Sequence, residues 1–493
     1  MRASGILLPI SGIWSAYGIG TFSKEAYEFV DFLKAAGQTY WQILPLGPTG
    51  YGDSPYQSFS TFAGNPYYID LEALIKAGFL SKERCEECDW GGSEAYVDYE
   101  KIYRSRFTVL KEAFRNSKIE EEEGFLNFVK ENDYWLPDYA LYMAIKDSHQ
   151  GKSWSEWEDD VRLRKPAALL RCREELKEEI LFYEFQQYLF ALQWAHLKKY
   201  ANDKGIRIIG DIPIYVAFDS ADAWANPELF QFDENRMPTG VAGCPPDAFS
   251  ATGQLWGNPL YRWDYHKETG YEWWMKRISY CYQLYDVVRI DHFRGFDEYY
   301  NIPFGDTTAE FGRWEKGPGY DLFQVMKKEI GNKPVIAEDL GYLTPSVFKL
   351  VKKTGYPGMK VLQFAFDAEG DSDYLPHKYP QNCIVYTGTH DNDTTLGWFD
   401  SLGRKDKRFA KAYLNIKSGK EVGWNFIRAA IASVADTAVI VMQDYLSLGG
   451  EARINLPSTI GNNWKWRMVK GQANDELAKR IYELCKLYGR VSR

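Results

Sequence analysis

The stretch VVRIDHFRGF, Val287 to Phe296, begins as a buried β-strand and then places four ionisable side chains within six residues. Burying an unpaired charge is costly, so this end of the strand needs partners or access to solvent. Seven other short apolar or β-branched runs in the chain also close on polar residues. In chain order the eight runs are GILLPI (5–10), YWQILPL (40–46), IRIIGDIPIYV (206–216), DVVRIDHF (286–293), PVIAEDL (334–340), MKVLQFAF (359–366), CIVYTGTHD (383–391) and AVIVMQDYL (438–446).

Amphipathic helical patterns lie between several of these runs. SKEAYEFVDFLKAAG (23–37) has apolar residues at three- and four-residue spacing and a glycine stop, and LFQVMKKEIG (322–331) has the same period. Apolar strands that alternate with amphipathic helices indicate a parallel sheet covered on its outer face. Eight such units predict an α/β fold of the (β/α)₈ TIM barrel type, with a doubly wound sheet as the alternative.

Two connections are too long for a simple barrel, and we interpret them as insertions into one barrel domain over residues 1–493. Residues 47–205 contain charged helical runs and are expected to form a largely helical subdomain. Residues 217–285 are rich in Gly, Pro and Asp and are expected to form a loop-rich subdomain over one end of the barrel. Loops of this length are usually functional.

The overall composition excludes several classes of protein. A chain with 45% apolar and 26% charged residues can bury a large core, and its formal charge of −9 argues against nucleic acid or an anionic membrane as a partner. The opening MRASGILLPISGIWS has too short an apolar core for a signal peptide, and no later run is long enough to cross a bilayer. A neutral substrate fits this charge better.

The seven cysteines show neither a disulfide framework nor a metal-binding spacing. The pair Cys85-x-x-Cys88 lacks the second pair that a zinc site requires. We therefore expect reduced thiols, a cytoplasmic location, and no metal or other cofactor.

Aromatic residues are abundant, with 17 Trp, 35 Tyr and 28 Phe. Most of them are expected in the core, because aromatic side chains bury the largest apolar area. Many, however, fall in loop-like stretches such as GPTGYGDSPYQSFS (47–60) and TGQLWGNPLYRWDY (252–265). Exposed aromatic surface of this kind suits the flat faces of sugar rings.

Acidic residues close several of the predicted strands, at the end of a (β/α)₈ barrel where chemistry takes place. They are Asp211, Asp291, Glu338, Asp339, Asp391 and Asp393, with His390 beside them. Any one of these carboxylates could simply cap a helix or bind a loop amide. Several that converge on a neutral-substrate cleft indicate glycosidic bond chemistry, which needs one acid to protonate the leaving oxygen and another to attack carbon or activate water.

The polar strand ends leave three questions open. Glu338 and Asp339 point to opposite faces, so one of the two is structural, and the pattern does not choose between them. Arg289 and Asp291 share a face, where Arg289 either holds Asp291 ionised as a nucleophile or forms an ordinary buried ion pair with it. His390 either donates to a sugar hydroxyl or is a satisfied core residue.

Five motifs carry a family resemblance: RIDHFRGF, AEDLG, GTHDNDT, VAGCPPDAFSATGQLWGNPLYRWD and GPTGYGDSPYQSFSTFAGNPYYIDL. Together they resemble the amylomaltase or disproportionating-enzyme family of 4-α-glucanotransferases, family 77 of the glycoside hydrolases, which are relatives of the α-amylases. The resemblance implies that Asp291 is the nucleophile, Glu338 the general acid/base and Asp391 the transition-state stabiliser. It thereby assigns the catalytic role to Glu338 rather than Asp339, with α-1,4-glucans as substrates.

The same resemblance implies a set of substrate contacts: Tyr56, Asp211, Arg289, His390, Trp256 and Asp367, with Ser54, Gln254 and Asn463 as further sugar contacts. The loops 51–60 and 244–261 are expected to cover the reaction intermediate and favour an acceptor sugar over water. Only 49 residues follow Asp444, which leaves no room for the C-terminal β-sandwich of α-amylases. A hydrolytic α-amylase-type enzyme and a non-catalytic glucan-binding protein are the alternatives.

Overall fold

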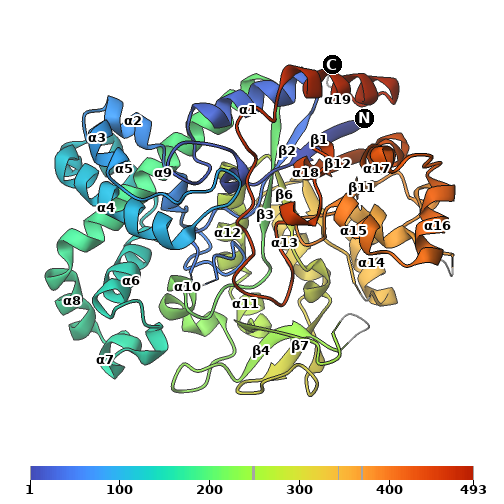
Figure 1. Cartoon of the computed structure of the whole chain (residues 1–493). Helices are drawn as coiled ribbons and strands as arrows, with labels where there is room; N and C mark the ends of the chain where they lie inside the picture. Colours follow the sequence, from blue (N-terminus) through green and yellow to red (C-terminus); the bar gives the residue numbers. More distant parts are fainter. Residues whose placement is uncertain (1, 51, 247–249, 342, 368–369, 492–493) are drawn as a thin grey trace.

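Eight parallel strands form the centre of the molecule (Figure 1). The computed structural model describes residues 2–50, 52–246, 250–341, 343–367 and 370–491. Each of the eight predicted runs overlaps one strand of this sheet. In chain order the strands are β1 (Ala3–Leu7), β2 (Tyr40–Gln42), β3 (Arg207–Ile212), β6 (Val287–Ile290), β9 (Val335–Ala337), β10 (Gly358–Val361), β11 (Cys383–Tyr386) and β12 (Thr437–Val441).

The sheet closes on itself. Its strand order is β10-β11-β12-β1-β2-β3-β6-β9, and the two end strands meet where the N–H of Ala337 donates to the carbonyl of Pro357 at 3.0 Å. The carboxylate of Asp339 adds a second link, accepting from the N–H of Met359 at 2.7 Å. A Cβ on Gly358 would lie 2.2 Å from this carboxylate, so any other residue there would displace the Asp339 side chain. Closure confirms the (β/α)₈ barrel and excludes the doubly wound alternative.

Helices cover the outside of the barrel, and the two predicted from amphipathic periodicity are confirmed as α1 (Lys24–Ala35) and α13 (Tyr320–Glu329). The last helix is α19 (Asp475–Leu487). α1 carries an acid in its first turn and a lysine in its last, and Gly37 beyond it has a φ of +69°. The side chain of Asn474 caps α19 by accepting from the N–H of Leu477. Strands enclosed by such helices are buried on both faces, and every residue of β1, β6, β9, β11 and β12 is buried.

The connection from β2 to β3 is built almost wholly of helices, coloured blue to green on the left of Figure 1. Its longest helix, α9, packs against α1, α4 and α6. The elements are η2 (Pro66–Tyr68), α2 (Leu71–Lys76), α3 (Lys82–Glu86), α4 (Tyr99–Ser117), η3 (Ile119–Glu121), α5 (Glu123–Glu131), α6 (Leu136–Ser148), η4 (Trp154–Glu156), α7 (Asp159–Arg162), α8 (Pro166–Glu175) and α9 (Lys177–Asp203). The division of the chain into a barrel and two inserted subdomains stays a prediction.

The connection from β3 to β6 contributes two strands to a small antiparallel sheet of order β5-β4-β7-β8, drawn at the bottom of Figure 1. The other two strands come from the stretch after β6, so the sheet joins two parts of the chain. Its strands are β4 (Gly240–Cys244), β5 (Gln254–Pro259), β7 (Glu298–Pro303) and β8 (Arg313–Lys316). The helices of this connection are α10 (Ala221–Ala225), η5 (Pro227–Leu229), α11 (Trp263–Glu268) and α12 (Glu272–Leu284).

The remaining helical elements connect the barrel strands or follow the last of them. They are η1 (Ile10–Gly12), η6 (Phe293–Phe296), α14 (Pro345–Thr354), η7 (Leu362–Ala365), η8 (Pro376–Lys378), α15 (Thr395–Ser401), α16 (Arg404–Tyr413), η9 (Gly419–Glu421), α17 (Val422–Ala432), α18 (Met442–Tyr445) and η10 (Gly450–Ala452). Residues 442–491 contain no strand, so no β-sandwich follows the barrel within them. In the described part of the chain, no helix combines the length and apolar character needed to cross a membrane.

Candidate active site

The register of the barrel sets Asp291 and Glu338 at one level of its carboxyl-terminal end, with Asp211 level with Arg289, two residues before Asp291. Asp211 of β3 pairs with Arg289 of β6, and Ile290 of β6 pairs with Ala337 of β9. Asp291 directly follows Ile290, and Glu338 directly follows Ala337. Because carboxyl ends of parallel barrel strands meet at the same rim, the predicted acids come together there.

Arg289 is the centre of this cluster. Its guanidinium group contacts Asp211 Oδ2 at 2.5 Å through Nη1 and Asp291 Oδ1 at 3.0 Å through Nη2. Arg289 and Asp211 are 3% and 1% exposed, whereas 28% of the Asp291 side chain is exposed. The charges at the end of this strand are therefore paired on the buried side, and Asp291 is partly open to solvent.

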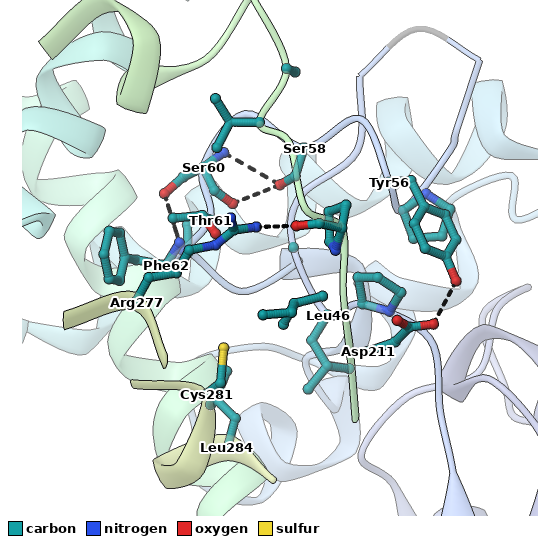
Figure 2. A pocket seen from close by; sticks show the side chains of 18 of the residues that line it. Leu46, Tyr56, Ser58, Ser60, Thr61, Phe62, Asp211, Arg277, Cys281 and Leu284 are labelled. Carbon is teal, nitrogen blue, oxygen red and sulfur yellow. Dashed lines mark hydrogen bonds between the residues drawn. The ribbon is translucent and has the colours of Figure 1, made fainter. Parts of the chain in front are cut away.

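Tyr56, from the β2–β3 connection, extends the cluster toward β11. Its hydroxyl donates to Asp211 Oδ2 at 2.7 Å, as Figure 2 shows, and lies 2.8 Å from Nε2 of His390. Since the one hydroxyl proton goes to the carboxylate, His390 Nε2 must be the donor to the tyrosine oxygen. The two rings stack with centroids 5.2 Å apart and an interplanar angle of 11°.

His390 is a neutral donor in this arrangement. Its side chain is buried, and burial lowers the pKa of the imidazole below its ordinary value. Nδ1 is buried without a hydrogen-bond partner, which agrees with a proton on Nε2 alone. The same Nε2 lies 3.4 Å from Asp391 Oδ1, so the histidine links Tyr56 to the third predicted carboxylate.

Asp391 is held by two residues that the sequence patterns did not indicate. Asn455 donates from Nδ2 to Asp391 Oδ1 at 2.7 Å, and Arg453 donates from Nη2 to the Asp391 carbonyl at 2.7 Å. The N–H of Asn455 also donates to the carbonyl of His390 at 3.1 Å. The Asp391 side chain is 42% exposed, so one of its oxygens is fixed while the group remains open to the cleft.

Glu338 and Asp339 have different surroundings. Glu338 accepts from the N–H of His292 at 2.7 Å and from the N–H of Leu340 at 2.8 Å, so its carboxylate lies beside the residue that follows Asp291. Asp339 points to the other face and binds the N–H of Met359 in the β9–β10 closure. Asp339 is thus the structural member of the pair.

Burial raises the pKa values of both Asp291 and Glu338, that of Asp291 well above its ordinary value, and Arg289 opposes the shift at both. The negative charge of Glu338 also raises the pKa of Asp291. Two carboxyl groups that interact in this way titrate as a pair. The pair keeps one proton at pH values above the usual titration range of a carboxylic acid. The cluster can therefore present one charged and one protonated carboxyl group at once.

Trp256, on β5, forms an aromatic wall of the site. Its indole N–H donates to Gln254 Oε1 at 3.1 Å, and its ring lies perpendicular to that of His292 with centroids 4.8 Å apart. Burial lowers the pKa of His292 to about 3, so this side chain is neutral. Gln57 donates to Asn258 Oδ1 at 3.1 Å and so connects the 51–60 and 244–261 loops, of which residues 51 and 247–249 lie outside the described part.

Three predicted contacts lie outside the polar cluster. Ser54 accepts from the N–H of Tyr56 at 3.3 Å and so shapes the turn that carries the tyrosine. Asn463 accepts from the N–H of Leu456 and donates to the carbonyl of Thr459, which ties its own loop together. Asp367 is exposed, after η7.

A cavity of about 50 Å³ lies behind Tyr56 and Asp211 (Figure 2). Leu46, Arg277 and Cys281 also line it. Oδ1 of Asp211 is buried and has no hydrogen-bond partner, so Oδ2 makes both contacts of this carboxylate, with Arg289 and Tyr56. Across the described residues, no group of three or more His, Cys, Asp or Glu side chains could hold a metal ion.

Comparison with known proteins places this geometry in a family. A family model described as 4-alpha-glucanotransferase matches residues 8–472. A 4-alpha-glucanotransferase of Clostridium butyricum is 50% identical over 483 residues, covering 98% of this chain and 99% of the relative. One from Thermus thermophilus is 48% identical over 501 residues, covering 99% of each chain.

Solved structures agree. An amylomaltase from Streptococcus agalactiae in complex with acarbose superposes with a TM-score of 0.97 at 43% identity and 100% coverage of both chains. An amylomaltase from Corynebacterium glutamicum, at 20% identity and a TM-score of 0.80, covers 100% of this chain and 75% of its own and shows the shared fold. With a family model over nearly the whole chain and relatives near half identity, this chain belongs to the 4-alpha-glucanotransferase family.

Proposed function

We propose that this protein is a 4-α-glucanotransferase that moves an α-1,4-glucan segment from a donor to the 4-hydroxyl of an acceptor glucan or glucose. The observation that carries the proposal is the pairing of Asp291 with Glu338 at the barrel mouth, where the Glu338 carboxylate binds the N–H of His292 and Arg289 holds Asp291. Asp291 contacts a guanidinium group, which suits a nucleophile. The buried Glu338 makes no such contact, which suits an acid.

In the first half-reaction the Asp291 carboxylate attacks the anomeric carbon of the donor. Glu338 gives its proton to the departing glycosidic oxygen, so the reducing-end fragment leaves with a free 4-hydroxyl and the rest of the chain stays bound to Asp291 as an ester. The Arg289 guanidinium opposes the effect of burial on the pKa of Asp291 and so favours its charge before attack, while burial raises the pKa of Glu338, which favours its protonated form.

In the second half-reaction the 4-hydroxyl of the acceptor gives its proton to Glu338 and its oxygen attacks the same carbon. The ester bond to Asp291 breaks, the carboxylate is restored, and two inversions return the α configuration. This retaining mechanism places the two carboxyl groups about 5 to 5.5 Å apart. We assign to Asp391, fixed by Asn455, hydrogen bonds to sugar hydroxyls that strengthen in the transition state.

The substrate contacts are part of the proposal. Tyr56, Asp211, Arg289 and His390 form one polar network that runs from Asp291 to Asp391, which suits recognition of a sugar bound between them. Trp256 with Gln254 supplies an apolar face and a fixed amide. Ser54, Asp367 and Asn463 are assigned to the periphery of the site.

The decisive experiment is incubation with maltotriose and analysis of the products. Transfer yields glucose together with maltopentaose and longer chains, whereas a hydrolase yields glucose and maltose only. Asp291→Asn should abolish both transfer and hydrolysis, and full activity in that variant would overturn the assignment.

We also propose a cytoplasmic location. All seven cysteines are free thiols, including the neighbouring pair Cys85 and Cys88, which suits a reducing compartment. Fractionation of the native host with an antibody against the chain tests this, and recovery outside the cytoplasmic fraction would contradict it.

A further inference from the structure

A buried lysine of the helical connection between β2 and β3 contacts the loop that carries Tyr56. Lys146, in the last turn of α6, is 5% exposed, and its ammonium group lies 5.1 Å from the ring centroid of Phe59. An aromatic ring attracts a cation more strongly when both are removed from water. Phe59 belongs to residues 52–60, which we call the tyrosine loop. The catalytic steps proposed above involve neither Lys146 nor Phe59.

An ion pair fixes the position of this ammonium group. Lys146 Nζ donates to Asp219 Oδ2 at 2.6 Å and to the carbonyl of Lys152 at 3.1 Å. Asp219 Oδ1 in turn accepts from the hydroxyl of Tyr142 at 2.6 Å and from the N–H of Trp154 at 3.3 Å. Because both oxygens of the carboxylate are bound, the carboxylate and the ammonium group are held in one arrangement.

Further contacts hold Phe59. A Cβ on Gly50 would lie 2.9 Å from Cζ of Phe59, so the edge of the ring packs closely against this glycine. The N–H of Phe59 donates to the carbonyl of Pro48 at 3.2 Å. The carbonyl of Phe59 accepts at 2.8 Å from the N–H of Ala221, which lies two residues after Asp219. Phe59 is therefore fixed by its ring and by both of its backbone groups.

The tyrosine loop connects this fixed position to Tyr56, three residues before Phe59. The hydroxyl of Ser58 lies 2.8 Å from the carbonyl oxygen of Ser60, as Figure 2 shows, so the chain turns tightly around Phe59. Tyr56 contributes to the site only while its hydroxyl lies 2.7 Å from Asp211 Oδ2. A displacement of the loop by about 1 Å would break this hydrogen bond, and a misplacement of that size can cost about a hundredfold in rate.

We propose that Lys146 is a positioning residue for glucan transfer, which holds the tyrosine loop through Phe59 so that the Tyr56 hydroxyl reaches Asp211. This inference rests on the proposed function. The competing role is that Lys146 only stabilises the fold. A buried ion pair is often no more stabilising than apolar residues of the same volume, whereas it does fix the direction of the side chains that it joins. The contacts of Lys146 therefore favour positioning.

Lys146→Met tests the proposal through kcat on maltotriose. The variant has a side chain of similar length without the charge, and kcat should fall about three- to thirtyfold, the factor of one cation–π contact, with little change in KM. In a Tyr56→Phe background the same substitution should change kcat by less than about twofold, because the hydroxyl that Lys146 positions is already absent. Lys146→Arg keeps a cation and should retain most of the activity. Lys111→Met, which removes an exposed lysine 5.6 Å from the ring of Phe182, should leave kcat unchanged in both backgrounds.

Amide hydrogen exchange measures the tyrosine loop directly and needs no substrate. Exchange in residues 52–60 should be faster in Lys146→Met than in the unmodified protein, and it should be unchanged in Lys111→Met. Phe59→Leu removes the ring and leaves the ion pair of Lys146 in place, so it should accelerate exchange and lower kcat in the same way. It takes the place of Lys146→Met if that variant does not fold.

Three results would overturn the proposal: an unchanged kcat, loop exchange that does not rise, or an equal fall of kcat with and without the Tyr56 hydroxyl. The last result would show a lysine that only stabilises the fold, because such a lysine acts alike in both backgrounds. Failure of the proposed function itself would look different. The unmodified protein would then not disproportionate maltotriose, whereas hydrogen exchange would still report whether Lys146 holds the loop.

Discussion

The side-chain amide of Asn455 donates a 2.7 Å hydrogen bond to Oδ1 of Asp391 from a position 64 residues further along the chain. This contact fixes the orientation of a carboxylate that is otherwise open to the cleft. Asn455→Ala should therefore lower kcat on maltotriose by about tenfold to a hundredfold with little change in KM, since hydrogen bonds to charged groups contribute about 1.5 to 3 kcal/mol. Asn425→Ala, which removes a surface amide, is the control. A rise in KM alone would show that Asn455 acts on binding rather than on Asp391.

Glu338 and Asp339 provide a matched pair of neighbouring substitutions. Glu338→Gln should reduce kcat by at least about a hundredfold, because the acid that protonates the leaving oxygen is lost. Asp339→Asn should keep most of its activity but lower the melting temperature, because the charged acceptor for the N–H of Met359 is lost at the barrel closure. Steady-state kinetics and thermal denaturation of both variants check this, and the reverse pattern would exchange the two roles.

The pH dependence of kcat/KM follows from the raised pKa values of the Asp291 and Glu338 carboxyl groups. Activity requires Asp291 charged, so it is lost as the pH falls through the lower apparent pKa of the pair. It requires Glu338 protonated, so it is lost as the pH rises through the upper one. Both limbs of the bell should therefore lie above the ordinary carboxylic range of about 3.9 to 4.3. An acidic limb at or below about pH 4 would contradict this.

Trp256 and Leu255 are neighbours on β5, and their side chains point to opposite faces of the strand. Leu255 therefore serves as the control for Trp256. Trp256→Ala should raise the ratio of hydrolysis to transfer, since the indole helps to exclude water from the intermediate. Leu255→Ala removes a side chain that is 39% exposed and should leave the ratio unchanged. The ratio is measured with maltotriose as substrate, by comparing the new reducing ends that hydrolysis releases with the longer chains that transfer forms. The idea fails if both variants behave alike.

Tyr56→Phe removes the hydroxyl that joins Asp211 to His390 and leaves the stacked ring in place. The unfolding free energy should fall by about 1.5 to 3 kcal/mol, the usual contribution of a hydrogen bond to a charged group. The effect on catalysis should be larger, because His390 loses the acceptor that fixes its Nε2–H. Denaturant unfolding measures the loss of stability and kcat on maltotriose measures the loss of catalysis, and we expect the second to be larger. A loss of stability without a loss of kcat would argue for a purely structural tyrosine.

The strands and strand-end acids were predictable because each lies within one short, continuous run of sequence. The buried runs around Asp211, Asp291 and Asp391 show their polar ends directly, and alternation along the run PVIAEDL (334–340) shows that Glu338 and Asp339 must differ. The choice between those two needed either the family resemblance or the contact of Asp339 with β10.

Other features depend on contacts between distant segments and leave no local pattern. Asn455 lies in a loop without periodicity, and its role exists only once that loop reaches Asp391. The small antiparallel sheet was not predicted either, because β4 finds its partner β7 on the far side of β6 in the chain.

The joint between β9 and β10 has a consequence for how the protein responds to heat. Most neighbouring strands of the barrel share several paired residues, whereas here the backbone bond from Ala337 to Pro357 and the Asp339 side chain complete the ring. Glu338 stands between these two links, so any loosening of the joint displaces the acid/base at once. Locally weaker regions open before the whole molecule unfolds. We therefore expect thermal inactivation to begin with the opening of this joint, at temperatures below those at which the core melts.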